Sequence, residues 1–272
     1  MEQSIDKIWQ LLEKTQKEYA ALNLHEAIDY EKFYLYSIIS HSTAIEGSSL
    51  SELDTQLLLD DGIVNSSKTM IEHLMNLDLK KAYDFAIEEA KKKTKITPDF
   101  LKEMNSLVLK NTGGIVNAAG GTFDSSKGDF RRCTVFAGGV PYMDFQKVIP
   151  KTEILCKEIN KVLDATKTLK DIYNLSFDAH LNLVTIHPWA DGNGRTSRLL
   201  MNYIQFYNDV VPSKLLQEEK QAYIQALNKS RSEETPEAFR EFMAKQHLQT
   251  LKQEIDNYRQ NLHKSNNFTL LF

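Results

Sequence analysis

Apolar residues recur at helical spacing along most of this chain. Residues 4–24 illustrate the pattern, because Ile5, Ile8 and Leu12 fall three or four positions apart, on one face of a helix. The same spacing predicts further helices over 27–45, 68–93, 97–109, 144–165, 171–186, 196–207, 218–231 and 235–262. The sequence therefore predicts an all-α fold, built as a helical bundle.

Some of these helices also have end signals. Ser51 has Asp54 three residues after it, close to a capping box, and Gly62 follows the same helical run. Thr97 and Pro98 form a helix start, with proline at the first helical position. These residues predict helix boundaries independently of the apolar period.

One region departs from the helical pattern. Residues 111–130 are rich in glycine and polar side chains, and we expect a long surface loop there. After it, two apolar runs flank Gly138 and Gly139, which predicts a tight β-hairpin near residues 132–143. Pro141 has no N–H to donate to a neighbouring strand, so this arm is short or lies at an edge. We expect a single hairpin beside the helices.

Composition limits the classes of function. With 272 residues, 42% of them hydrophobic, the chain can bury a proper core in one large domain or two modest ones. The formal net charge of −4 argues against general nucleic-acid binding, which uses a basic face. A local basic pocket is compatible with this charge, and its candidates are Arg131, Arg132, Arg195 and Arg198.

Three further features favour a cytoplasmic location. No apolar run approaches the length of a membrane span, and the polar first residues do not resemble a signal peptide. The two cysteines, Cys133 and Cys156, have no metal-binding spacing and fit a reducing compartment.

Candidate chemistry concentrates in residues 185–198. An apolar helical run ends there at His187 and Pro188, and proline biases the residue before it away from helical geometry. His187 therefore lies at a corner of the chain. Its ordinary pKa of about 6.5 suits a general base at neutral pH.

A second helical run begins near Gly194. Glycines at 192 and 194 let the backbone approach a ligand closely, and the first amides of a helix attract anions. Arg195 and Arg198 are three positions apart, so they share a helix face and can bind the same anion. Asp191 offers the oxygen ligand that Mg²⁺ on phosphates usually takes. Together with His187, these residues predict a phosphate-transfer site.

The stretch resembles the Fic-domain signature, His-x-Phe-x-Asp/Glu-Gly-Asn-Gly-Arg-x-x-Arg. This chain reads His187-Pro188-Trp189-Ala190-Asp191-Gly192-Asn193-Gly194-Arg195-Thr196-Ser197-Arg198. Trp189 stands where the family most often has Phe. Both are large aromatics, so we expect a repacked core and unchanged chemistry. The resemblance covers roughly residues 30–250 and implies the Fic fold, a helical bundle around a central helix-loop-helix that carries the signature.

The resemblance implies a protein adenylyltransferase, which transfers AMP from ATP to a hydroxyl side chain of a target protein. In that reaction His187 takes the hydroxyl proton and Asp191 holds Mg²⁺. Tyr223 matches a tyrosine that the family places near the adenine and ribose, although core packing explains this residue equally well. The implied phosphate-binding residues are Gly192, Asn193, Gly194, Arg195 and Arg198.

A second motif lies in the N-terminal part. Ser42-Thr43-Ala44-Ile45-Glu46-Gly47 resembles the inhibitory motif of Fic proteins, Ser/Thr-x-x-x-Glu-Gly/Asn, and matches it at Ser42, Glu46 and Gly47. In the family, this glutamate reaches the second signature arginine, here Arg198, and occupies the place of the γ-phosphate. The resemblance therefore implies autoinhibition. The motif alone leaves open a solvated glutamate at a helix end.

A third match concerns the expected hairpin. Gly128-Asp129-Phe130-Arg131 fits the Gly-x-Phe/Tyr-Arg segment that precedes a hairpin called the flap in Fic proteins. The flap, here residues 132–143, holds an extended segment of the target by main-chain hydrogen bonds, a form of β-augmentation. The flap residues that the resemblance assigns to the binding site are Val135, Phe136, Ala137 and Gly138.

Other functions stay open at this point. The same site fits removal of AMP from a target, with Glu46 orienting water, or transfer of another phosphate-containing group. A non-enzymatic nucleotide-binding regulator is a further alternative, against which the intact His187 argues. The expected partners are ATP and a target protein, with no membrane and no general nucleic acid, and a homo-oligomer is left open.

The chain divides into three predicted regions. Residues 1–95 form an N-terminal helical region with the inhibitory helix. Residues 96–250 form the Fic core. Residues 251–272 are the end of the C-terminal helix and an apolar tail.

Overall fold

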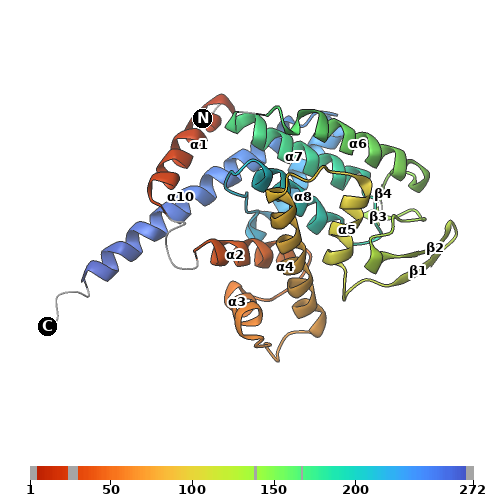
Figure 1. Cartoon of the computed structure of the whole chain (residues 1–272), viewed down its shortest axis with the longest axis horizontal. Coiled ribbons are helices and arrows are strands. Elements are labelled where there is room, and N and C mark those ends of the chain that lie inside the picture. Colours follow the sequence, from red (N-terminus) through yellow and green to blue (C-terminus); the bar gives the residue numbers. More distant parts are fainter. Residues whose placement is uncertain (1–4, 24–29, 138–139, 167, 268–272) are drawn as a thin grey trace.

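Ten α-helices and two short β-hairpins form the described part of the chain, residues 5–23, 30–137, 140–166 and 168–267 of a computed structural model (Figure 1). The helices are α1 (Ile5–Ala21), α2 (Tyr30–Ile45), α3 (Glu52–Asp61), α4 (Met70–Lys91), α5 (Pro98–Val108), α6 (Val148–Leu163), α7 (Leu169–Ile186), α8 (Asn193–Tyr207), α9 (Lys220–Ser232) and α10 (Glu237–Asn267). The predicted all-α fold is confirmed.

Helices α7 and α8 run through the middle of the molecule, with the predicted active loop, residues 187–192, between them (Figure 1). Nearly every residue of α8 is buried, so this helix needs neighbours on all sides. It packs against α7, α4, α5 and α2. One cluster of buried apolar side chains joins α4, α5 and α8, and a second joins α1, α7 and α10. The loop is therefore anchored at both ends in packed helices.

The end signals lie where the sequence predicts them. At the start of α3, the Ser51 hydroxyl accepts from the Asp54 N–H at 3.1 Å, and the Asp54 carboxylate accepts from the Ser51 N–H at 3.0 Å. Gly62 ends the helix in the left-handed conformation, with φ 68°. Thr97 caps α5, and Pro98 is its first residue.

The expected hairpin near residues 132–143 is present. Strands β3 (Phe136–Ala137) and β4 (Val140–Pro141) pair antiparallel, with Phe136 opposite Pro141. The turn residues Gly138 and Gly139 lie outside the described residues.

The glycine-rich segment before the flap corrects one expectation. In place of a continuous loop it contains a second antiparallel hairpin, β1 (Ile115–Ala118) and β2 (Gly121–Asp124). Gly120 lies at its turn, where a Cβ atom would come within 2.3 Å of the Arg132 carbonyl oxygen. The glycine is thus explained by close packing of this turn against the base of the flap.

The two ends of the described chain meet in one helix pair. Helix α1 packs along α10, and α10 continues well beyond the rest of the molecule (Figure 1). The apolar tail expected at residues 268–272 lies outside the described residues. The division at residues 95 and 250 stays a prediction. Among the described helices, none is long and apolar enough to cross a membrane.

Candidate active site

His187 lies at a corner of the chain, immediately after α7. Its N–H still donates to the Leu183 carbonyl at 2.9 Å, but its backbone is left-handed, with φ 54° and ψ 62°. The residue is thus non-helical, as predicted, although in the left-handed region and not the extended one. A non-glycine residue in this conformation is held there at a cost of about 1–3 kcal/mol, and such residues cluster at functional sites.

Two contacts orient the imidazole of His187. Its Nδ1 lies 3.3 Å from the Val184 carbonyl oxygen. The ring of Tyr142 stacks on it, with 3.7 Å between ring centres and 13° between the planes. Because a carbonyl only accepts hydrogen bonds, the Val184 contact favours a proton on Nδ1, which leaves the Nε2 lone pair available to a substrate.

The environment of His187 favours its neutral form. Burial, together with the charges of Arg131 and Arg231, lowers the pKa of this imidazole to about 4, against the opposing effects of the Val184 carbonyl and of Glu46. The side chain is therefore unprotonated at neutral pH. A general base has to start in this state.

The loop after His187 is held by Trp189 and Asn193. The Asn193 side chain accepts from the Trp189 N–H at 3.0 Å and donates to the Trp189 carbonyl at 2.9 Å. The Trp189 ring is fully buried against Phe130, and its indole N–H donates to the Gly128 carbonyl at 3.0 Å. The larger aromatic is thus accommodated in the core. The Asn193 side chain is fully engaged inside the loop, so only its backbone can face a phosphate.

The start of α8 leaves backbone amides without a partner. Gly192, at φ 77°, is the N-cap residue, and no side chain of the described chain caps this end. The first helical bond is donated by the Thr196 N–H to the Gly192 carbonyl at 2.9 Å, so the amides before Thr196 have no partner within the helix. This is the geometry of an anion site.

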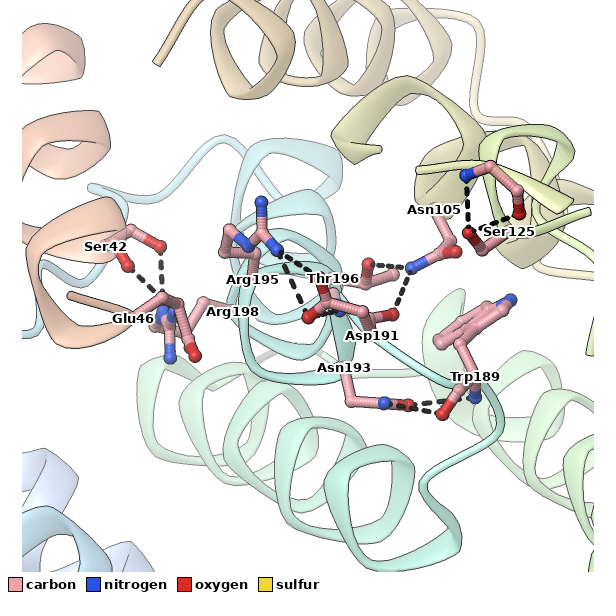
Figure 2. A network of polar contacts seen from close by, with 12 residues as sticks. Ser42, Glu46, Asn105, Ser125, Trp189, Asp191, Asn193, Arg195, Thr196 and Arg198 are labelled. Atoms are coloured by element: carbon pink, nitrogen blue, oxygen red, sulfur yellow. Dashed lines mark hydrogen bonds and ion pairs between the residues drawn. The ribbon is translucent and has the colours of Figure 1, made fainter. Parts of the chain in front are cut away.

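Arg198 connects this helix to α2. Its Nε donates to the Ser42 hydroxyl at 2.8 Å, and its Nη2 donates to the Ser42 carbonyl at 2.9 Å and to the Glu46 carboxylate at 2.7 Å (Figure 2). The Arg198 side chain is buried, whereas that of Glu46 is 33% exposed. The sequence-predicted residues Ser42, Glu46 and Arg198 are thus brought together.

The Glu46 carboxylate lies directly over the start of α8. A Cβ atom on Gly194 would come within 2.3 Å of Glu46 Oε1. Burial alone would raise the pKa of Glu46, but the charge and hydrogen bond of Arg198, with smaller contributions from Arg195 and Lys220, hold it below its usual value. A negative charge already occupies this anion site. Gly47, at φ 106°, follows in a conformation that favours glycine.

Two buried arginines of α8 retain unpaired donors. Arg195 contacts Asp191 at 3.4 Å, while its Nε and Nη1 have no partner in the described structure. Arg198 Nη1 is unpaired in the same way. Buried guanidinium groups with unused N–H groups can donate to anionic oxygens that come within reach of them.

Asp191 precedes the helix start with its side chain 68% exposed. One of its oxygens accepts from the Gly192 N–H at 2.6 Å, and its backbone carbonyl accepts from Asn105 (Figure 2). The described residues contain no group of three or more His, Cys, Asp or Glu that could hold a metal. Asp191 can thus contribute one carboxylate to a Mg²⁺ ion whose other ligands are phosphates and water, the usual arrangement for this metal.

A cleft of about 1090 Å³ brings part of this set together, without Asp191 and Arg195 among its lining residues. His187, Glu46 and Arg198 line it together with the flap residues Pro141, Tyr142 and Met143 and with residues of α9. Tyr223 is among the latter. It is buried, and its hydroxyl lies 2.9 Å from His180 Nε2. Tyr223 therefore combines the two roles left open by its sequence, a position at the cleft and a place in the core.

The flap residues named from sequence lie on its first arm. The Val135 carbonyl accepts from the Tyr142 N–H at 2.9 Å, and the side chain of Phe136 is 64% exposed. Ala137 is part of β3, and Gly138 lies outside the described residues. The cleft itself is lined by the second arm, Pro141–Met143.

Arg131 corrects the expectation of a basic pocket. It is buried, and its guanidinium donates to the backbone carbonyls of His187, Cys133 and Met143. Its donors are therefore engaged in joining the flap to the corner at His187. Arg132 is exposed beside the turn of β1 and β2. Of the four arginines named from the sequence, Arg195 and Arg198 remain candidates for binding an anion.

Sequence reasoning missed Tyr142 and Arg231. Arg231 donates to the Val184 carbonyl at 3.1 Å and to the Thr185 hydroxyl at 3.0 Å, and its guanidinium carbon lies 5.7 Å from the centre of the Tyr142 ring. Neither residue stands in a motif. Only the three-dimensional approach of the flap and α9 to His187 reveals them.

Comparisons with known proteins show what this chain is similar to. Residues 95–205 match the model of the Fic/DOC family. "Protein adenylyltransferase fic-1" of Caenorhabditis briggsae is 29% identical over 202 residues, 73% of this chain and 36% of that protein. "Protein adenylyltransferase Fic" of Culex quinquefasciatus is 32% identical over 230 residues, 79% of this chain and 42% of that protein. The chain thus spans less than half the length of these relatives.

Solved structures share the fold. Fic-1 (residues 134–508) from C. elegans superposes with a TM-score of 0.73 at 24% identity, covering 94% of this chain and 73% of that one. A Fic domain containing signaling protein from Bacteroides thetaiotaomicron gives a TM-score of 0.72 at 20% identity, covering 93% of this chain and 97% of that one.

Proposed function

We propose that this chain, which carries a Fic/DOC domain at residues 95–205, is a protein adenylyltransferase that transfers AMP from ATP to a hydroxyl side chain of a target protein. Relatives over most of the chain bear the name protein adenylyltransferase. One observation carries the proposal. A neutral, oriented histidine lines the same cleft as an uncapped helix start and a buried arginine.

The chemistry follows from these positions. ATP binds as substrate with its phosphates at the start of α8, against the backbone amides and the unpaired donors of Arg195 and Arg198. His187 Nε2 takes the proton from the target hydroxyl. The hydroxyl oxygen then forms a bond to the α-phosphorus, and the bond from that phosphorus to the β-phosphate oxygen breaks, which releases pyrophosphate. The arginines stabilise the negative charge that develops on the leaving group.

Asp191 is the residue that would hold Mg²⁺ in this site. When bound, the metal supplies charge neutralisation on the phosphates. The exposed carboxylate fits this use, since Mg²⁺ commonly takes one or two carboxylates together with substrate phosphates. Arg195, 3.4 Å from Asp191, holds the carboxylate near the helix start.

Glu46 makes the site autoinhibited in this proposal. The carboxylate accepts a hydrogen bond from Arg198 Nη2 and lies over Gly194, where the terminal phosphate of ATP would otherwise bind. ATP then binds with its triphosphate displaced, and the α-phosphorus is out of line with the target hydroxyl. Ser42 supports this state, because it holds the same guanidinium through its hydroxyl and its carbonyl.

The target is proposed to bind along the flap by main-chain hydrogen bonds. The short arms β3 and β4, together with the exposed Phe136, suit an extended segment. A cytoplasmic location and self-association remain predictions.

Incubation with ATP labelled at the α-phosphate tests the function. We expect label on the protein itself or on proteins of a cell extract, in a Glu46→Gly variant above all. Label from the γ-phosphate would instead indicate phosphate transfer. Nucleotide binding without any labelling, in the variant as well, would contradict an enzyme and support a nucleotide-binding regulator.

A second function has a specific observation in its favour. Glu46 and His187 line the same cleft, so a water molecule between them could be oriented by the carboxylate. Removal of AMP from a modified target is therefore the alternative. A modified target that loses AMP with the wild type and keeps it with Glu46→Gly would support this reverse reaction.

A further inference from the structure

We propose that Tyr142 is a positioning residue, whose ring holds the imidazole of His187 in the orientation from which it accepts the hydroxyl proton. The role of His187 in this statement rests on the proposed function. The stacking itself does not, and it can be measured without any transfer reaction.

The side chain of a histidine does not fix its own ring plane. The second side-chain torsion of histidine is broad, so the surroundings decide how the ring lies. The Val184 carbonyl at 3.3 Å constrains the ring at its Nδ1 edge. The Tyr142 ring, parallel within 13° and 3.7 Å away, constrains the face. An edge contact and a face contact together define the direction of Nε2.

Arg231 supports both contacts at once. It donates to the Val184 carbonyl at 3.1 Å, the same oxygen that meets His187 Nδ1. Its guanidinium carbon lies 5.7 Å from the Tyr142 ring centre, within the range of a cation–π contact. A single residue of α9 thus holds the carbonyl and the aromatic ring that orient the base.

The position of Tyr142 depends in turn on the flap. Its N–H donates to the Val135 carbonyl at 2.9 Å, across the hairpin. Arg131 donates to the Met143 and His187 carbonyls, which joins the same arm to the catalytic corner. The flap, proposed to bind the target, therefore also sets the orientation of the base.

Electrostatics supply a measurable consequence. The charged groups that act on His187 are Arg131, Arg231 and Glu46, and burial is the largest influence on its pKa. Loss of the Tyr142 ring would expose one face of the imidazole to water. The pKa of His187 should then rise from about 4 toward its ordinary value.

NMR titration of ring-labelled histidine in the full chain tests the stack. His187→Asn identifies the signal. We expect Tyr142→Phe to leave the shifts and the pKa of His187 close to wild type, because a ring remains. Tyr142→Ala, or Tyr142→Leu if alanine prevents folding, should remove the upfield ring-current shift and raise the pKa. Ile115→Ala, on the exposed strand β1, is the control and should change neither. An unchanged His187 signal in Tyr142→Ala would overturn the proposal.

Kinetics then test whether the stack matters for transfer. In a Glu46→Gly background, Tyr142→Ala should lower kcat by about 10²-fold, the scale of a small misplacement at a reacting centre, with an unchanged KM for ATP. Tyr142→Phe in the same background should keep the rate of the Glu46→Gly parent. Full activity of Tyr142→Ala despite a lost ring-current shift would refute the positioning role. If the Glu46→Gly parent itself never labels protein, the proposed function fails, while the NMR comparison still decides whether Tyr142 holds the imidazole.

Discussion

Replacement of Glu46 by glycine should activate transfer. The substitution removes the carboxylate that lies 2.7 Å from Arg198 Nη2 and over Gly194. It leaves the helix intact, because α2 ends at Ile45, one residue before Glu46. The γ-phosphate of ATP can then bind Arg198, and the α-phosphorus comes into line with the target hydroxyl.

The size of the effect follows from the contact that ATP must replace. A hydrogen bond to a charged group contributes about 1.5–3 kcal/mol, and the exposure of one third of the Glu46 side chain argues against a larger value. Every 1.4 kcal/mol corresponds to about tenfold in an equilibrium. If the rate follows the fraction of correctly bound ATP, Glu46→Gly should be about 10- to 150-fold more active than wild type.

The assay compares labelling by wild type, Glu46→Asp and Glu46→Gly at equal concentrations of labelled ATP. Glu46→Asp should be intermediate, because the shorter side chain reaches less far. Arg198→Ala should not be activated, since it removes the phosphate ligand together with the inhibitory contact. Glu234→Gly is a matched control, because this glutamate lies in the turn before α10 at φ 54°, a conformation that glycine accepts.

Equal labelling by wild type and Glu46→Gly would refute this reasoning and show that the contact with Arg198 does not control transfer. Nucleotide affinity should be measured in parallel. If Glu46→Gly binds ATP much more tightly than wild type but transfers at the same rate per bound ATP, then Glu46 excludes the nucleotide and does not misalign it.

Three further outcomes are expected. His187→Ala should lower the transfer rate by about 10²–10⁴-fold with ATP binding retained, and a parental rate would remove its role as base. Asp191→Ala should abolish both activity and its dependence on Mg²⁺, whereas activity that still responds to Mg²⁺ would place the metal elsewhere. Burial lowers the pKa of His180 and of His247 to about 3, so the unfolded chain binds more protons than the folded chain below about pH 6.5. Thermal denaturation should therefore show stability falling as the pH falls from about 6.5 toward 3, and a flat profile would contradict this.

The sequence predicted those features that short-range patterns determine. The helix period located the two central helices, and local side-chain chemistry located the starts of α3 and α5. The contact between Glu46 and Arg198 was also expected, although it joins distant parts of the chain. That expectation came from two motifs whose relative position the family resemblance supplied.

What the sequence missed depends on tertiary contacts. Strand β1 reads Ile-Val-Asn-Ala, which does not alternate apolar and polar residues, and all four positions are exposed or half-buried. Gly120 is explained by packing against Arg132. Arg131 was a candidate for a local basic pocket because its charge is visible in the sequence. Its burial among backbone carbonyls cannot be seen in the sequence. The stack of Tyr142 on His187 likewise has no local signal.

The arrangement of the two signature arginines bears on how inhibition works. Glu46 engages only Arg198 Nη2, whereas Nη1 of that residue, together with Nε and Nη1 of Arg195, remains unpaired. The amides at the start of α8 also remain uncapped. An inhibitor that prevented nucleotide binding would be expected to satisfy these buried donors, because leaving them unpaired is costly. Glu46 instead lies over Gly194 and leaves these donors unpaired. The unpaired donors thus favour inhibition by displacement of the triphosphate, in which the inactive enzyme still binds ATP.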